Sequence, residues 1–170
     1  MPTKLPSVVI GAAVYTVLSV ILSFVAFSGG MVATVIGSCG ACLTALVGPL
    51  VAVWHYTSTH RLTIPAGTGA GIGAGAGVLG AIFGGVITLV LQAVDLLPGV
   101  EEQLVRTRQM LIESGMDPAQ VDQQLEAQSA FSSPIVTFVI AAVIGAVVGA
   151  IAGAIGASVF KKGEARMDDV

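Results

Sequence analysis

Four long runs without a charged side chain constrain this sequence more than any other feature. They occupy residues 7–27, 31–53, 66–94 and 134–160. About 21 residues of α-helix cover the roughly 30 Å hydrocarbon core of a bilayer, so each run is long enough to cross a membrane. Only 10% of the 170 residues are charged, against roughly 25% in soluble domains. The sequence therefore predicts an all-α fold in one membrane domain, a four-transmembrane-helix bundle.

The flanks of the first run raise the alternative of a cleaved signal peptide. Lys4 precedes this run, and the small residues Ala26, Ser28 and Gly29 follow at its end. The apolar run is, however, longer than the roughly 7 to 15 residues of a signal-peptide core. We therefore expect the first run to remain in the protein as a membrane span.

The distribution of charge predicts which way the bundle faces. Residues 95–133, the only sizeable polar segment, carry two arginines against seven acids: Asp95, Glu101, Glu102, Glu113, Asp117, Asp122 and Glu126. The other polar segments carry five basic residues: Lys4, Arg61, Lys161, Lys162 and Arg166. Because Lys and Arg favour the cytoplasmic side, we expect both termini and the connection between spans two and three in the cytoplasm. The acidic segment then faces outward, and the reverse orientation is the alternative.

The acidic segment has the pattern of a helical hairpin. Pro98 is expected to open the first helix, whose apolar residues recur at helical spacing until Gly115, a favourable C-terminal cap. Asp117, Pro118 and Gln120 then supply an N-cap, a first-turn proline and a capping-box partner for a second helix. This hairpin is expected to cap the bundle, lie on the membrane surface or contact a partner.

Two spans carry glycines at four-residue spacing. The six residues concerned are Gly69, Gly73 and Gly77 in the third span and Gly145, Gly149 and Gly153 in the fourth. Small residues on one face let two helix backbones approach closely in a membrane. We expect these helix-packing glycines to join the third and fourth spans, or one face to be left for another protein chain.

Cys39 and Cys42 form a C-x-x-C pair, which is a pattern of redox-active thiols. Membrane disulfide-generating enzymes of the DsbB and vitamin K epoxide reductase types also use four-helix bundles, but they relay electrons through a second cysteine pair. This chain has two cysteines in total, and both lie well inside the second span, where a thiolate is disfavoured. We expect buried packing residues, with a redox pair as the weaker alternative.

The remaining motifs do not indicate catalysis. The glycine run of residues 67–77 lacks the strand and the Gly-Lys-Ser/Thr ending of a phosphate-binding loop. No ionisable residue lies within a span, where transporters and channels usually carry one. His55 and His60 are expected near the membrane interface, where Trp54 and Tyr56 also belong, and Gln92 and Asp95 are expected to cap the third span. We therefore expect no catalytic residue, cofactor or metal, and the net charge of −3 argues against nucleic acid.

The chain resembles a bacterial membrane family catalogued as domain of unknown function 4199. The resemblance rests on residues 66–94, 101–110 and 113–117, and on Gln120, Gln123, Gln124, Glu126, Ser133 and Pro134. It implies two helices, a small-residue third helix, an acidic segment and a closing helix ending in lysines, in the bacterial cytoplasmic membrane. It implies no activity and therefore no functional residues.

These features predict a non-catalytic integral membrane protein, an accessory or scaffolding subunit of a larger membrane complex. Membrane lipids and other membrane subunits are the expected partners, and a homo-oligomer is possible. A small homo-oligomeric transporter or channel is the alternative, with the glycine faces lining or supporting the pore. A membrane thiol redox protein is the third hypothesis.

Overall fold

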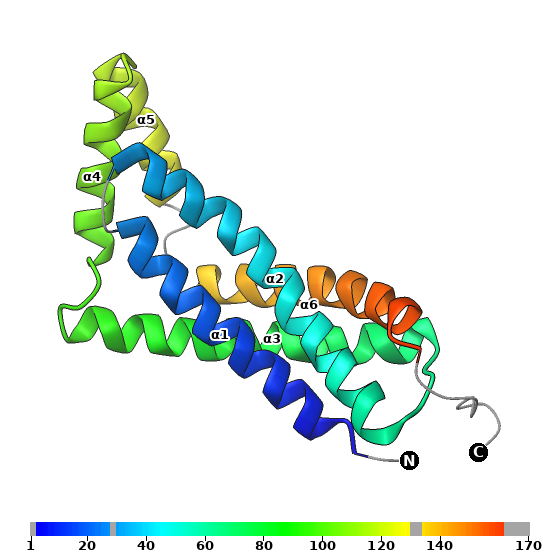
Figure 1. Ribbon diagram of the computed structural model, residues 1–170. Helices are drawn as coiled ribbons and strands as arrows, with labels where there is room; N and C mark the ends of the chain where they lie inside the picture. The colour runs from blue at the N-terminus through cyan, green and yellow to red at the C-terminus, as the bar shows by residue number, and fades with distance from the viewer. Residues whose placement is uncertain (1–2, 28–29, 130–133, 162–170) are drawn as a thin grey trace.

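The residues that the structure describes fold into helices connected by short segments (Figure 1). The computed structural model describes residues 3–27, 30–129 and 134–161. These residues form six helices: α1 (Leu5–Phe27), α2 (Gly30–His60), α3 (Ala66–Ala93), α4 (Val100–Glu113), α5 (Pro118–Ser129) and α6 (Pro134–Val159). Of these, α1, α3 and α6 are long and apolar enough to cross a membrane. The expectation of an all-α fold is confirmed.

The long helices pack as two antiparallel pairs that cross each other. α1 packs on α2 and α3 packs on α6, and the two pairs meet where they cross (Figure 1). The hydrophobic core lies at this crossing and comes from all four helices and the α2–α3 connection: Val8, Ala52, Val53, Tyr56, Ile64, Ile72, Ala76 and Ala157. The start of α1, the α2–α3 connection and the end of α6 lie at one end of the molecule, and α4 and α5 lie at the other.

Glycines on α1 and α2 bring that pair together. A Cβ atom added to Gly11 would lie 2.7 Å from the carbonyl oxygen of Gly48 and 2.6 Å from the Cβ of Ala52. No side chain fits at that distance, so the close approach of these two helices requires glycine. These residues give no local signal in the sequence, because they are spread among larger apolar side chains.

α2 continues past the expected end of its span at Val53 and stops at His60. The hydroxyl of Thr57 donates a hydrogen bond to the Val53 carbonyl at 3.0 Å, which keeps this polar residue within the helix. Tyr56 is completely buried in the core, so its ring packs against the other helices. Trp54, which points away from the core, is exposed.

α4 and α5 form a helical hairpin that projects from the bundle (Figure 1). Gly115 adopts a φ of +90°, a left-handed conformation that favours glycine, and so confirms its expected role in ending α4. The carboxylate of Asp117 accepts a hydrogen bond from the backbone N–H of Ala119 at 2.8 Å, as an N-cap does. Val121 of α5 is completely buried.

The start of α4 differs from the expectation, because the helix begins at Val100 with Gly99 as its N-cap. Pro98 lies before the cap, in the connection between α3 and α4. Its carbonyl accepts hydrogen bonds from the side-chain amides of Gln92, at 3.3 Å, and Gln103, at 2.9 Å. These two amides tie the end of α3 to the first turn of α4.

Candidate functional site

The structure places the six packing glycines opposite one another along α3 and α6. Gly69 lies against Gly153, Gly73 against Gly149, and Gly77 against Gly145. A Cβ added to Gly145 would lie 2.7 Å from the carbonyl oxygen of Gly77, so backbone packs directly on backbone. We refer to these six residues as the glycine seam.

The glycine seam lies inside the chain and offers no free face to a second protein. Each of its glycines has a partner glycine within the same molecule, which leaves no room for a helix from another chain between them. Of the two roles expected for these glycines, contact between the third and fourth spans is the one that the structure places them in.

Cys39 and Cys42 are exposed on α2 and are not bonded to each other. The expectation that they are buried is therefore wrong. The reason is which face of α2 packs on α1. Gly37 lies against Ala26 and Gly40 lies against Leu22, both on α1. The cysteines are therefore on the other side of α2.

The two histidines of α2 are part of helix packing. The hydroxyl of Ser7 and Nδ1 of His55 lie 3.0 Å apart, which links the start of α1 to the end of α2. The ring of His60 packs edge-on against Tyr56, with 4.9 Å between ring centroids. Within the described residues, no three His, Cys, Asp or Glu side chains lie close enough together to hold a metal ion.

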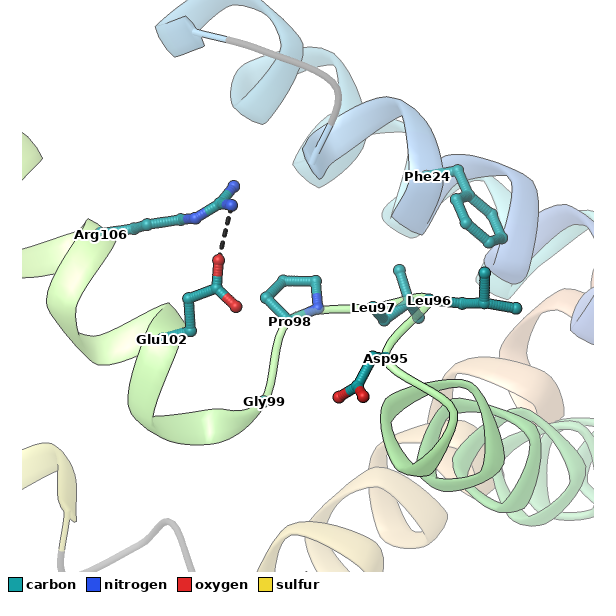
Figure 2. Close-up of a pocket in the computed structure, with 8 residues that line it drawn as sticks. All are labelled: Phe24, Asp95, Leu96, Leu97, Pro98, Gly99, Glu102 and Arg106. Atoms are coloured by element: carbon teal, nitrogen blue, oxygen red, sulfur yellow. Dashed lines mark hydrogen bonds and ion pairs between the residues drawn. The ribbon is translucent and has the colours of Figure 1, made fainter.

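A pocket lies at the connection between α3 and α4, and we consider it the candidate functional site (Figure 2). We call it the junction pocket. Its volume is about 400 Å³, and it is lined by Phe24 of α1, by residues 95–99 of the connection, and by Glu102 and Arg106 of α4. The apolar side chains and the charged side chains therefore meet in one hollow at the end of the bundle.

The charged groups of the junction pocket carry a net negative charge. Arg106 donates to the Glu102 carboxylate at 2.7 Å, one helical turn away (Figure 2). Asp95 adds a second carboxylate at the end of α3 and forms no ion pair within the described part of the chain. The pocket thus has two acids and one base, an arrangement that suits a ligand with a positive group.

Comparison with known proteins identifies the family. A family model described as a protein of unknown function, DUF4199, matches residues 8–162. The chain belongs to the DUF4199 family. No curated protein and no solved structure gives a significant match.

For this DUF4199 chain the match begins within the first turn of α1 and extends past the end of α6. The resemblance stated from the acidic segment and the spans is thereby confirmed. The family description names no activity. Sequence reasoning missed the junction pocket, because Phe24 and Asp95 are far apart in the chain, and the only local signal was the polar end of α3.

Proposed function

We propose that this protein is a non-catalytic integral membrane protein that serves as an accessory or scaffolding subunit of a larger membrane complex. In this proposal α1, α2, α3 and α6 cross the bacterial cytoplasmic membrane. The termini and the α2–α3 connection lie in the cytoplasm, and the α4–α5 hairpin lies outside.

Two features support α2 as the fourth span. α2 has 31 residues, which exceeds the roughly 20 needed to cross the hydrocarbon core, and it pairs with the apolar α1. The start of α1, the α2–α3 connection and the end of α6 lie at the same end of the bundle (Figure 1), and their flanking basic residues are Lys4, Arg61 and Lys161. An excess of Lys and Arg on one side favours that side as cytoplasmic.

The observation that carries the subunit role is the hairpin. Outside its connections, α4 and α5 pack only on each other among the described helices. Val105 and Ile112 lie about two turns apart on one face of α4 and are exposed outside the proposed membrane region. An exposed apolar face on a projecting element is typical of a protein contact.

The test is purification of the protein from its native membranes in a mild detergent. We expect at least one other membrane protein to co-migrate in a fixed ratio. The double substitution Val105→Ser and Ile112→Ser should release that protein while thermal unfolding of the bundle stays unchanged. Met110→Ser, which alters an exposed apolar residue on a different side of α4, is the matched control.

Two outcomes contradict the proposal. One is a defined homo-oligomer without other chains, which favours the transporter or channel alternative and calls for ion flux measurements in liposomes. The other is a co-migrating protein that both the double variant and Met110→Ser release equally, which indicates that the α4 face is not the contact.

A further inference from the structure

The buried core of the bundle ends about halfway along α3. Ile72 and Ala76 are buried at the crossing. Phe83 and Val90 follow Ile72 by about three and five helical turns and therefore lie on the same face. They are nevertheless 42% and 56% exposed. The face of α3 that packs on the other helix pair at the crossing is thus uncovered toward the hairpin.

α2 shows the same change on its own core-facing side. Val53 is completely buried, whereas Leu46, Cys42 and Val35 lie on the same face about two, three and five turns earlier and are exposed. Figure 1 shows α1 and α2 diverging from α3 toward the hairpin end. We call this region the open half, defined by Val35, Cys42 and Leu46 of α2 and by Phe83, Ile87 and Val90 of α3.

The junction pocket lies at the same end of the molecule as the open half. Phe24, an exposed apolar side chain of α1, forms one wall of the pocket, and Leu96 reaches the same side (Figure 2). Asp95, Glu102 and Arg106 form the polar part. An apolar region beside a charged pocket suits an amphiphilic ligand, which has an apolar part and a charged part.

The backbone at Asp95 supports a role for its carboxylate. α3 ends with hydrogen bonds from Asp95 N–H to Gln92 and from Leu96 N–H to Leu91, and Asp95 has a φ of +56°. α4 ends with the same pair of bonds around Gly115. Glycine is the usual residue at this position, because other side chains are strained there. At α3 the position carries an acid that lines the pocket instead.

We infer that the open half and the junction pocket together bind one phospholipid with an ammonium head group, of the phosphatidylethanolamine class. Its acyl chains lie against Phe83, Ile87 and Val90 and the facing side of α2. Its ammonium lies against the Asp95 carboxylate and its phosphate against Arg106, whose guanidinium has donors beyond the one held by Glu102. A helix from another protein matches the apolar walls but not the net negative pocket. The inference rests on the proposed placement of these helices in a bilayer and not on the subunit role.

The first experiment measures lipid retention by the isolated full-length chain. The protein is equilibrated with equal amounts of phosphatidylethanolamine and phosphatidylglycerol in detergent, and bound lipid is counted by native mass spectrometry. We expect phosphatidylethanolamine to be retained preferentially and Asp95→Asn to lower its retention about threefold to tenfold, the loss of one charge-assisted contact. Asparagine tolerates the left-handed backbone, so this variant keeps the fold. Asp117→Asn removes the same charge at another helix end and should retain lipid like the wild type.

The second experiment locates the acyl chains. Phosphatidylethanolamine with a photoactivatable diazirine in its chain is bound and irradiated, and the labelled peptides are identified. Labelling should be stronger at residues 35–46 and 83–90 than at Val143 and Val147. These two valines are also exposed, on the side of α6 away from the glycine seam. Phe24→Ala, at an exposed position, should reduce this labelling and leave unfolding unchanged.

Three results overturn the inference. The first is equal retention of both lipids, unaffected by Asp95→Asn. The second is diazirine labelling as strong at Val143 and Val147 as in the open half. The third is cross-linking of Cys42 by a bifunctional thiol reagent, either to a second copy of this chain or to another protein. Such a cross-link would show that a protein fills the open half. A lack of co-purifying subunits affects none of these readouts, so failure of the subunit role remains distinguishable.

Discussion

Gly73 and Gly149 face each other so closely that the carbonyl oxygen of each occupies the space in which a Cβ of the other would lie. This reciprocal contact lies at the centre of the glycine seam, between the outer pairs Gly69–Gly153 and Gly77–Gly145. In lipid the hydrophobic effect does not drive helices together. Dispersion contacts between closely packed backbones stabilise the pairing of α3 and α6 instead.

The first prediction concerns this contact. Gly73→Ala should destabilise the bundle by about 1–3 kcal/mol, because the added methyl group forces α3 and α6 apart. Gly71→Ala, two residues away with nothing within 4 Å of its added Cβ, should be neutral or slightly stabilising, since alanine favours helix over glycine. Thermal unfolding in detergent followed by circular dichroism measures both. Equal unfolding temperatures for the two variants would show that the seam contributes little.

The second prediction concerns the cysteines. Cys42→Leu should change the free energy of unfolding by less than about 0.5 kcal/mol, because the side chain is exposed and a larger apolar group meets no neighbour there. Gly48→Ala, on the side of the same helix that faces α1, should be clearly destabilising, because its Cβ would lie 2.9 Å from the backbone carbonyl oxygen of Gly11. The same unfolding measurement applies. A strongly destabilised Cys42→Leu would mean that this face of α2 is covered.

The third prediction concerns the ion pair that joins α4 to α5. The hydrogen bond from Arg108, with its positive charge, lowers the pKa of the Asp122 carboxyl below its ordinary value, despite an opposing effect of burial. A lowered carboxyl pKa in the folded state stabilises the hairpin above about pH 4. This contribution is lost as the pH falls through the folded-state pKa.

Arg108→Gln should therefore return the Asp122 pKa toward its ordinary value. The measurement is a carbon NMR titration of aspartate-labelled full-length protein, with the Asp122 signal assigned from Asp122→Asn. Arg106→Gln is the control, because Arg106 pairs with Glu102 instead. An Asp122 titration that is the same in wild type and Arg108→Gln would show that the pair does not form in solution.

The fourth prediction concerns orientation. In a background with Cys39→Ser and Cys42→Ser, a cysteine at exposed Gln123 of α5 should react with a membrane-impermeant maleimide in intact cells. A cysteine at exposed Thr59, near the end of α2, should react only after the cells are permeabilised. The opposite pattern would establish the reverse orientation, and reaction of both in intact cells would indicate that α3 does not cross.

The sequence predicted the elements of this fold better than their contacts. Long uncharged runs and the caps at Gly115 and Asp117 are local signals, and the helices end close to where they indicate. The four-residue spacing of Gly69, Gly73 and Gly77 marked a small face. The register that sets Gly73 against Gly149 depends on how two helices cross, which no local pattern encodes.

The candidate site was beyond sequence reasoning for the same reason. The junction pocket combines Phe24 with Asp95, and the open half combines α2 with α3, so both depend on where the two helix pairs diverge. The burial expected for Cys39 and Cys42 was wrong because it assumed that a small residue in a span faces a neighbour. Here Gly37 and Gly40 take that role toward α1.

The glycine seam also determines the order in which the molecule can be completed during biosynthesis. α3 and α6 are separated in the chain by the whole α4–α5 hairpin, so α3 leaves the ribosome well before its partner. A nascent chain that ends before Pro134 presents Gly69, Gly73 and Gly77 to the bilayer without the glycines that cover them. The glycine seam therefore cannot form until α6 has been synthesised.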